Sequence, residues 1–208
     1  DLDRLAWQLH PFGMAEKPDL DLNRRASLQQ LADEAGRNVV DVYIDRLIES
    51  EGKEFFNFWM FGGALQNQWK YMQLPQVIPM LGDAGAHVGF FTDADSPTVL
   101  LGELTREQGV YTLPEAVNRI SGASAEVIGL KDRGLLKEGW QADINIIDYD
   151  NLGSKQPYYV NDFPHGGGRF VVESTGYDAT LVAGQVIIEH GKHTGRRPGK
   201  VIREFHRG

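Results

Sequence analysis

The residues with the clearest capacity for chemistry lie in the segment MLGDAGAHV, Met80–Val88. Asp83 directly follows an apolar run, and the small residues after it allow its carboxylate to face open space. At the carboxyl end of a strand, where barrels and open α/β sheets form their active sites, such a carboxylate can bind a metal ion or act as a general base. The alternative is that Asp83 caps the turn that follows it. His87 lies four residues later and either faces the same cavity or forms structural hydrogen bonds.

Two further groups of acidic and histidine side chains carry weaker patterns. Asp93 and Asp95 precede a Ser-Pro dipeptide, a position that favours helix capping and interaction with the helix dipole over metal binding. His190 and His193 form the pattern H-x-x-H at the end of a predicted strand. In a strand, side chains three residues apart point to opposite faces, so this pair is a poor metal site.

Several sequence patterns of known enzyme classes are absent. The chain has no G-x-S-x-G elbow, Walker A loop or H-E-x-x-H helix, which disfavours serine hydrolases, P-loop enzymes and zincins. His165 precedes three glycines, but no helix is predicted after them, so this segment is predicted to be a flexible loop rather than an anion site. The chain lacks cysteine, which excludes disulfides, thiolate metal ligands and a cysteine nucleophile within these residues.

The composition limits the partners and the compartment. The 208 residues include 21 Lys and Arg against 29 Asp and Glu, and the formal net charge of -8 disfavours binding to nucleic acid. Apolar runs are only a few residues long, whereas a membrane span needs about 18 residues. We therefore expect a soluble protein with no nucleic-acid or membrane partner. The absence of cysteine favours a reducing compartment, so we expect a cytoplasmic location.

Helical patterns occupy the first quarter of the chain. Residues 1–26 show no clear period and are predicted to be loop with short helical pieces. Ser27 and Gln30 form a capping box, and apolar residues at helical spacing predict a helix that ends near Gly36. A second amphipathic helix is predicted over residues 39–50.

Two apolar runs predict buried strands, and helices follow them. The runs FFNFWMFGG from Phe55 and VIPMLGD over residues 77–83 are almost continuously apolar and end in small residues. Strands that are apolar on both faces and separated by helices indicate a parallel α/β sheet. The helical signals that follow are Ser96-Pro97 as N-cap and first helical residue, a capping box from Thr112 to Glu115, and a short helix over residues 124–130.

At about residue 131 the apolar period changes from helical to alternating. The segment ADINIID places Ala142, Ile144 and Ile146 on one face of a predicted strand. Three more segments, RFVVE, ATLVA and QVIIE, are also predicted to be strands. Ala183-Gly184, between the last two, fits a two-residue hairpin turn. The last third of the chain is therefore predicted to be a small antiparallel β unit.

Three stretches together resemble the amidohydrolase superfamily and, within it, the N-acyl-D-amino-acid deacylases, or D-aminoacylases. GDAGAH, Gly82–His87, looks like the segment after the eighth barrel strand, which supplies an essential aspartate in that superfamily. Ile120–Asp148, with R-G-x-L and then A-D before a strand, is similar to the superfamily's return from barrel to β-sandwich. Gly176–Arg203 looks like the C-terminal hairpin and T-G-x-R-P-G tail of the deacylases.

The resemblance implies an α/β fold: the C-terminal part of a metal-dependent (β/α)8 TIM barrel over residues 1–130, followed by an antiparallel β-sandwich segment over residues 131–208. It also implies one or two Zn2+ ions, which lower the pKa of a water that attacks an amide carbonyl. Asp83 would bind metal, accept the proton of that water and pass it to the leaving nitrogen. His87 would help to bind or orient the substrate.

The chain departs from the family pattern in its metal ligands. The H-x-H after the first strand, the histidines after strands five and six, and the bridging Cys of the deacylases are not in this sequence. A catalytic zinc needs about three protein ligands, and the sequence opens without an initiator Met or a signal peptide. We therefore expect the remaining ligands on the rest of the same polypeptide or on a companion chain, and we expect the segment alone to be inactive. Assembly into a homo-oligomer is left open.

Three functions fit these observations. The first is hydrolysis of linear amide C–N bonds, which releases a carboxylate and a D-amino acid from an N-acyl-D-amino acid. The second is a related amidohydrolase reaction, that of a cyclic amidase or a deaminase. The third is a non-catalytic fragment or interaction module. Because two buried strands cannot close a barrel, we expect this chain in isolation to be unstable.

Overall fold

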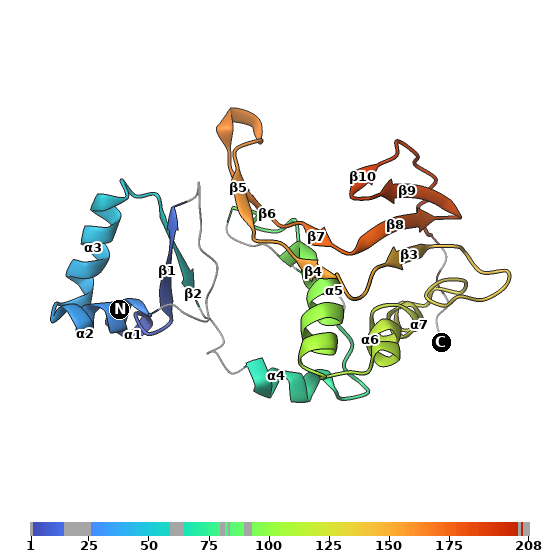
Figure 1. Ribbon diagram of the computed structural model, residues 1–208, viewed down its shortest axis with the longest axis horizontal. Helices are drawn as coiled ribbons and strands as arrows, with labels where there is room; N and C mark the ends of the chain where they lie inside the picture. Colours follow the sequence, from blue (N-terminus) through green and yellow to red (C-terminus); the bar gives the residue numbers. More distant parts are fainter. Residues whose placement is uncertain are drawn as a thin grey trace. The chain divides into compact units, whose positions relative to one another are not determined.

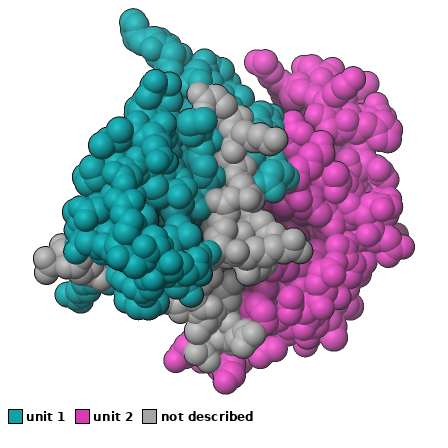
Figure 2. Space-filling model, turned by 60° about the vertical axis from the view of Figure 1, so that its left-hand side comes forward, with its two compact units in different colours: residues 1–65, 84–92, 156–172 teal, residues 66–83, 93–155, 173–208 magenta. Residues whose placement is uncertain are grey.

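The structure is a computed structural model that describes residues 2–14, 26–58, 65–79, 82, 84–89, 93–203 and 205 (Figure 1). The chain divides into two compact units, which are coloured separately in Figure 2. Unit 1 comprises residues 1–65, 84–92 and 156–172, and unit 2 comprises residues 66–83, 93–155 and 173–208. Each unit combines segments from before and after residue 130, and the predicted division there into barrel and sandwich segments stays a prediction.

Local hydrogen bonds set the ends of the first helices of unit 1, which are α1 (Leu2–Leu5), α2 (Leu28–Ala35) and α3 (Val39–Glu49). The Gln30 N–H donates to Ser27 Oγ at 3.2 Å, and the Ser27 N–H donates to Gln30 Oε1 at 2.7 Å. The predicted capping box is therefore confirmed, as are the two predicted helices. α2 ends at Gly36, which adopts φ +61°. The buried apolar cluster of this part comprises Ala6, Leu28, Ala32 and Val39.

The substitution Ser27→Ala is expected to lower the free energy of unfolding by about 1 kcal/mol, the typical cost of removing an N-cap side chain. Ser27 is 2% exposed, so water cannot readily replace the acceptor that the Gln30 N–H loses. Urea unfolding of the complete protein, followed by circular dichroism, measures the change. Ser154→Ala, at an exposed position, is the matched control and should change stability by less than about 0.5 kcal/mol. Equal losses in the two variants would contradict the capping role.

An antiparallel pair of strands, β1 (Leu9–Met14) and β2 (Glu54–Phe58), completes this part of unit 1. The prediction of loop and short helices over residues 1–26 is wrong at β1. Pro11 has no N–H, and the register shifts between Pro11 and Gly13, so the strand shows no regular alternation in sequence. The fully buried strand predicted from FFNFWMFGG is corrected over residues 55–58, because β2 is antiparallel and none of its residues is buried. Residues 59–63 of this run lie outside the described residues.

The helices in the middle of the chain are α4 (Leu65–Met72), the 3-10 turn η2 (Asp93–Asp95), α5 (Ser96–Val99), the π-helix η3 (Leu100–Glu107), α6 (Leu113–Ile120) and α7 (Gly122–Val127). The predicted N-cap at Ser96 is wrong: η2 runs directly into α5, so Ser96 is already helical and Asp95 is the N-cap. The predicted capping box at Thr112 is confirmed, and its N–H donates to Glu115 Oε2 at 2.8 Å. No helix in the described part of the chain has the length and apolar character needed to cross a bilayer. The buried cluster of unit 2 comprises Leu100, Leu101, Tyr111, Ala116 and Leu152.

The second predicted strand, VIPMLGD, does not form among its described residues. Residues 77–79 and Gly82 are in no strand, and residues 80, 81 and 83 lie outside the described residues. A strand exists through its ladder partners, and the described part of this segment has none. Every strand pair that the described residues form is antiparallel, so the parallel sheet indicated by the sequence is not part of the described structure.

The predicted antiparallel character of the last third of the chain is confirmed. A four-stranded sheet has the order β10-β9-β8-β3, and two short pairs, β4 with β7 and β5 with β6, lie between β3 and β8 in sequence. The bounds are β3 (Ile144–Ile147), β4 (Gly153–Ser154), β5 (Tyr158–Val160), β6 (Arg169–Val171), β7 (Ser174–Thr175), β8 (Tyr177–Val182), β9 (Gln185–Glu189) and β10 (Lys192–His193).

One detail of this sheet confirms the sequence prediction and one corrects it. Ala183 and Gly184 join β8 to β9 with φ +48° and +75°, and a type I′ turn requires positive φ at both central residues. Ile144 and Ile146, predicted to lie on one face, pair with Leu181 and Ala179 with no register shift between them, although Ile146 is 51% exposed. The register with β8 shifts after Ile146, so the alternation of faces predicted along this segment ends at Ile147.

Candidate functional site

The segment that carries the predicted site residues is described on both sides of Asp83. Asp83 itself lies outside the described residues, so its roles as metal ligand and proton carrier stay predictions. Residues 84–89 are described and form a series of turns and bends. His87 lies in this segment and is exposed. Its role in substrate binding also stays a prediction.

The turn over residues 84–89 contains backbone conformations that residues with a Cβ rarely adopt. Gly85 adopts φ +87° and His87 adopts φ +47°. A left-handed conformation is open to Gly but costs a residue with a Cβ roughly 1–3 kcal/mol. Surrounding contacts must offset this cost, and one of them is the hydrogen bond from the Phe170 N–H to the Val88 carbonyl at 2.8 Å. Glu51, His165, Ala183 and His190 also adopt positive φ, so this conformation of His87 fits a tight turn and does not by itself assign the residue a function.

A pocket of about 700 Å³ within unit 2 reaches Gly82, the residue before Asp83. Most of its lining is apolar and comes from α4, α5, η3 and α6, and its polar groups include Asp95 and Ser96. Asp95 is the N-cap of α5, as its position in the sequence indicates, but its carboxylate makes no side-chain hydrogen bond to the start of the helix. The side chain of Asp93 lies outside the described residues. The pocket has the size of a small-molecule site, with a carboxylate among its lining groups.

Arg119 of α6 holds the chain that leads towards the predicted site. Its Nη1 donates to the Val77 carbonyl at 2.6 Å, and its Nη2 donates to the Gln73 carbonyl at 3.0 Å. The guanidinium carbon lies 5.0 Å from the centroid of the Tyr111 ring, and Tyr111 Oη donates to the Met72 carbonyl at 2.7 Å. Burial raises the pKa of Tyr111, and the positive charge of Arg119 opposes this in part. The sequence did not reveal this clamp, because a cation in the last turn of a helix is already expected from the helix dipole.

The glycine-rich segment after His165 forms the tip of the β5–β6 hairpin. His165 adopts φ +61° in a short 3-10 turn, η4 (Pro164–Gly166). Arg169 at the base of this tip donates from Nε and Nη2 to the Asp162 carboxylate, at 2.8 and 2.7 Å. These hydrogen bonds lower the pKa of Asp162 and raise that of Arg169. The guanidinium of the hairpin is therefore engaged by a carboxylate of the same hairpin.

The described residues contain no group of three or more His, Cys, Asp or Glu side chains that could hold a metal ion. Because a catalytic zinc takes about three protein ligands, the described part of the chain does not by itself fit the zinc that the resemblance implies. In the H-x-x-H pattern, His190 lies in a turn with φ +46°, and His193 Nδ1 accepts a hydrogen bond from the Gly195 N–H at 2.9 Å. The latter contact stabilises the turn after β10.

Comparison with known proteins finds relatives over part of the chain. The sequence model of one family, described as the amidohydrolase family, matches residues 63–188. The N-acyl-D-aspartate deacylase of Alcaligenes xylosoxydans xylosoxydans is 30% identical over 106 residues, which are 50% of this chain and 19% of that protein. The dihydroorotase of Lactobacillus acidophilus is 28% identical over 114 residues, which are 53% of this chain and 26% of that protein.

A solved structure gives a likeness over nearly the whole chain. The N-acyl-D-glutamate deacylase of Bordetella bronchiseptica, crystallised with zinc and a phosphonate inhibitor that mimics the tetrahedral intermediate, matches with a TM-score of 0.54 and 20% identity. The match covers 98% of this chain and 39% of that chain. It fits a TIM-barrel-type fold with mixed α/β content. This chain therefore spans less than half the length of that structure, and its aligned part spans about a fifth of the Alcaligenes enzyme.

Proposed function

Because the chain belongs to the amidohydrolase family, we propose that its protein is a metal-dependent hydrolase of linear amide C–N bonds. The proposed substrates are N-acyl-D-amino acids, which are hydrolysed to a carboxylate and a D-amino acid. The observation that carries the proposal is the family match over residues 63–188, which include the GDAGAH segment around Asp83. The similarity to a deacylase of N-acyl-D-aspartate supports the substrate class.

Asp83 is the proposed proton carrier of the reaction. A carboxylate at the end of a barrel strand can accept the proton of the attacking water and then donate it to the leaving nitrogen. A bound zinc ion would supply a Lewis acid that lowers the pKa of the water and polarises the amide carbonyl. His87, exposed in the turn after Asp83, is proposed to bind or orient the substrate.

Zn2+ is the proposed metal, as one or two ions, and the zinc in the Bordetella deacylase structure supports this choice. Since the described residues supply no complete set of ligands, we propose that the remaining ligands lie on the rest of the polypeptide or on a companion chain. The 208 residues alone are accordingly expected to be inactive.

The complete protein is expected to hydrolyse N-acetyl-D-amino acids and to lose at least about a hundredfold in rate after treatment with a zinc chelator, with recovery on adding Zn2+. Release of the amino acid is measured for the aspartate, glutamate, methionine and leucine derivatives. The L-enantiomers are the matched controls, because they carry the same groups with the opposite configuration. Equal rates with and without chelator would remove the metal mechanism, and equal rates for both enantiomers would remove the D-amino-acid assignment.

The similarity to a dihydroorotase favours one alternative, the hydrolysis of a cyclic amide. The T-G-x-R-P-G tail, which resembles that of the deacylases, argues for the linear substrate instead. Dihydroorotate and hydantoin, assayed beside the N-acetyl-D-amino acids, separate the two. Turnover of the cyclic compounds alone would replace the proposed function with this alternative.

A further inference from the structure

We infer that the β5–β6 hairpin positions the turn after Asp83, with Phe170, Tyr159 and Gly168 as positioning residues for His87. The inference rests on the proposed function, in which His87 binds or orients the substrate. It goes beyond that function because it gives a role in the site to a hairpin that comes far later in the chain.

The turn over residues 84–89 has a conformation that needs support from outside. Two of its residues, Gly85 and His87, have positive φ, and residues 84–87 are all exposed. A left-handed residue with a Cβ persists only where the surrounding structure fixes it. Val88 and Gly89, at the end of the turn, are partly buried and make contacts outside it.

Those contacts come from the hairpin. The Phe170 N–H donates to the carbonyl of Val88, the residue after His87, at 2.8 Å. The turn and the hairpin also lie close together at the next residue, because a Cβ added to Gly89 would lie 3.9 Å from the Gly168 carbonyl oxygen. β6 is labelled in Figure 1 beside its hairpin partner β5. Since the bond joins main-chain atoms, its geometry depends on where β6 is held and not on the side chain at position 88.

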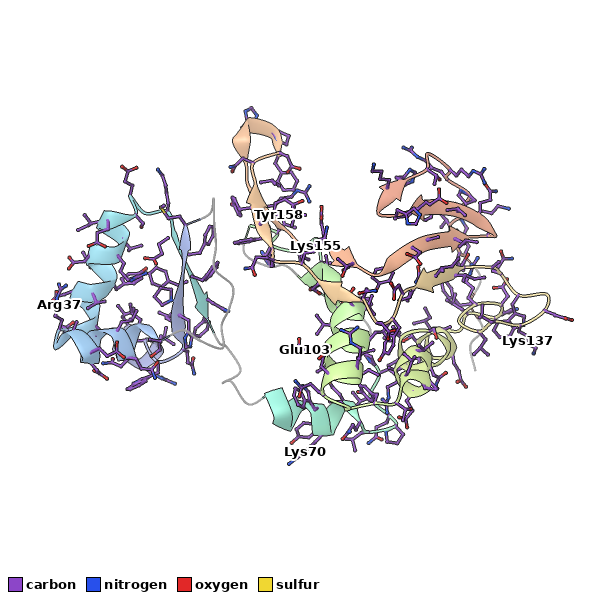
Figure 3. All side chains as sticks on the ribbon, viewed as in Figure 1. Arg37, Lys70, Glu103, Lys137, Lys155 and Tyr158 are labelled. Atoms are coloured by element: carbon purple, nitrogen blue, oxygen red, sulfur yellow. The ribbon has the colours of Figure 1, made fainter. Side chains whose placement is uncertain are left out.

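An aromatic cluster holds β6 in place. Phe170 is 7% exposed, and its ring centroid lies 5.1 Å from that of Phe55 and 4.9 Å from that of Tyr159, both edge to face. Phe55 of β2 also stacks on Phe12 of β1, with centroids 5.6 Å apart. Ring pairs in these geometries stabilise the elements that carry them. The hairpin, on which Figure 3 labels the adjacent residue Tyr158, is thus anchored on the β1–β2 pair, and the turn is anchored on the hairpin.

Gly168 is the residue that lets Tyr159 take its place in this cluster. A Cβ at position 168 would lie 2.2 Å from Tyr159 Cε1 and 2.4 Å from its Oη. The Tyr159 ring therefore lies directly against the main chain, two residues before Phe170. An alanine at position 168 must displace this ring, and the displacement acts on the strand that bonds Val88.

Hydrogen exchange of the complete protein tests this arrangement without any assay of activity. In the Gly168→Ala variant, the amide of residue 170, which donates to the Val88 carbonyl, should exchange at least about tenfold faster, because the bond between the hairpin and the turn opens more often. Phe170→Ala should have the same effect on the amide at position 170. Gly199→Ala, at a position with no neighbouring atom within 4 Å, is the matched control and should leave this amide unchanged. Unchanged exchange at position 170 in both hairpin variants would overturn the inference.

A double-mutant cycle between Gly168 and Tyr159 tests whether the close approach of these two residues transmits the effect. Tyr159→Ala removes the ring that an alanine at position 168 would strike. Gly168→Ala should therefore have a large effect on exchange in the unchanged background and little further effect in the Tyr159→Ala background. Effects that add in full would show that the close approach of Gly168 to Tyr159 does not transmit the change.

Kinetics then separate positioning of His87 from a general loss of structure. Gly168→Ala should lower kcat/KM for an N-acyl-D-amino acid by about 10- to 100-fold, mainly through KM, with bound zinc unchanged. In the His87→Ala background the same substitution should have little further effect, since the group it positions is gone. Additive losses in kcat/KM would show that the hairpin acts on the protein as a whole. If the unmodified protein hydrolyses no N-acyl-D-amino acid, the proposed function fails, and the exchange measurements still decide whether the hairpin anchors the turn.

Discussion

The variant Asp83→Asn of the complete protein is expected to lower kcat/KM for an N-acyl-D-amino acid by about a thousandfold, within the range of 10² to 10⁴ that general acid–base catalysis contributes. The amide of Asn has nearly the size of the carboxylate. It takes up no proton at neutral pH and brings no negative charge to a metal ion, so both proposed roles of Asp83 are lost together. Steady-state hydrolysis in the presence of zinc measures the first loss, and metal analysis of the dialysed protein measures the second.

Asp150→Asn is the matched control for this experiment. Asp150 is exposed in the loop between β3 and β4, so the variant loses the same charge from a position that solvent screens. Its kcat/KM and zinc content should equal those of the unmodified protein, and thermal unfolding of both variants shows whether either has lost its fold. If Asp83→Asn kept the activity of Asp150→Asn, Asp83 would not be the proton carrier.

The features that the sequence predicted correctly are those fixed by residues close together in the chain. The helix start at Ser27 depends on a partner three residues away, and the helix start at Thr112 depends on Glu115 in the same way. The hairpin at Ala183-Gly184 depends on two consecutive residues that tolerate positive φ. Each of these signals is complete within a few residues, so no knowledge of the rest of the fold is needed to recognise it.

The features that it missed depend on partners far away in the chain. β1 is recognisable only beside β2, because Pro11 and the bulge after it remove the alternation that marks a strand. The same limit applies around the site. Asp83 and His87 stand out because small residues surround them, whereas Arg119 and Phe170 act through main-chain carbonyls of residues 77 and 88. Every residue has a main-chain carbonyl, so the sequence does not show which carbonyl accepts such a hydrogen bond.

Gly134 shows how the structure explains a residue that the sequence singled out only by resemblance. It adopts φ +85°, and a Cβ there would lie 2.8 Å from both the Ala125 Cβ and the Ser121 carbonyl oxygen. The glycine of the R-G-x-L pattern therefore allows the loop after α7 to pack against the helix. The position needs a glycine because of its positive φ and the lack of space for a Cβ, and neither requirement can be read from the spacing of residues in the sequence.

The variant Gly176→Ala is expected to lower the free energy of unfolding of the complete protein by about 3 kcal/mol. Gly176 joins β7 to β8 with φ +84°, and a Cβ there would lie 2.6 Å from Leu152 Cα and 2.8 Å from the Asp148 carbonyl oxygen. Both neighbours are main-chain atoms, which cannot rotate away as a side chain could. Leu152 is 1% exposed and belongs to the buried cluster of unit 2, so displacing it also disturbs the core. Left-handed strain and overpacking each cost about 1–3 kcal/mol, and both apply here.

Two matched glycine variants divide this loss into its causes. Gly184→Ala has a similar φ of +75°, but its nearest neighbour, the Ala142 Cβ, is 4.0 Å away, so it reports the strain alone and should cost about 1 kcal/mol. Gly199→Ala has neither a positive φ nor a neighbour within 4 Å and should change stability by less than about 0.5 kcal/mol. Urea unfolding of the three variants measures the series. A clearly larger loss of stability at position 176 than at position 184 would isolate the cost of the backbone contact. Equal losses at the two positions would contradict the close approach of Gly176 to Leu152, because strain would then account for the whole effect.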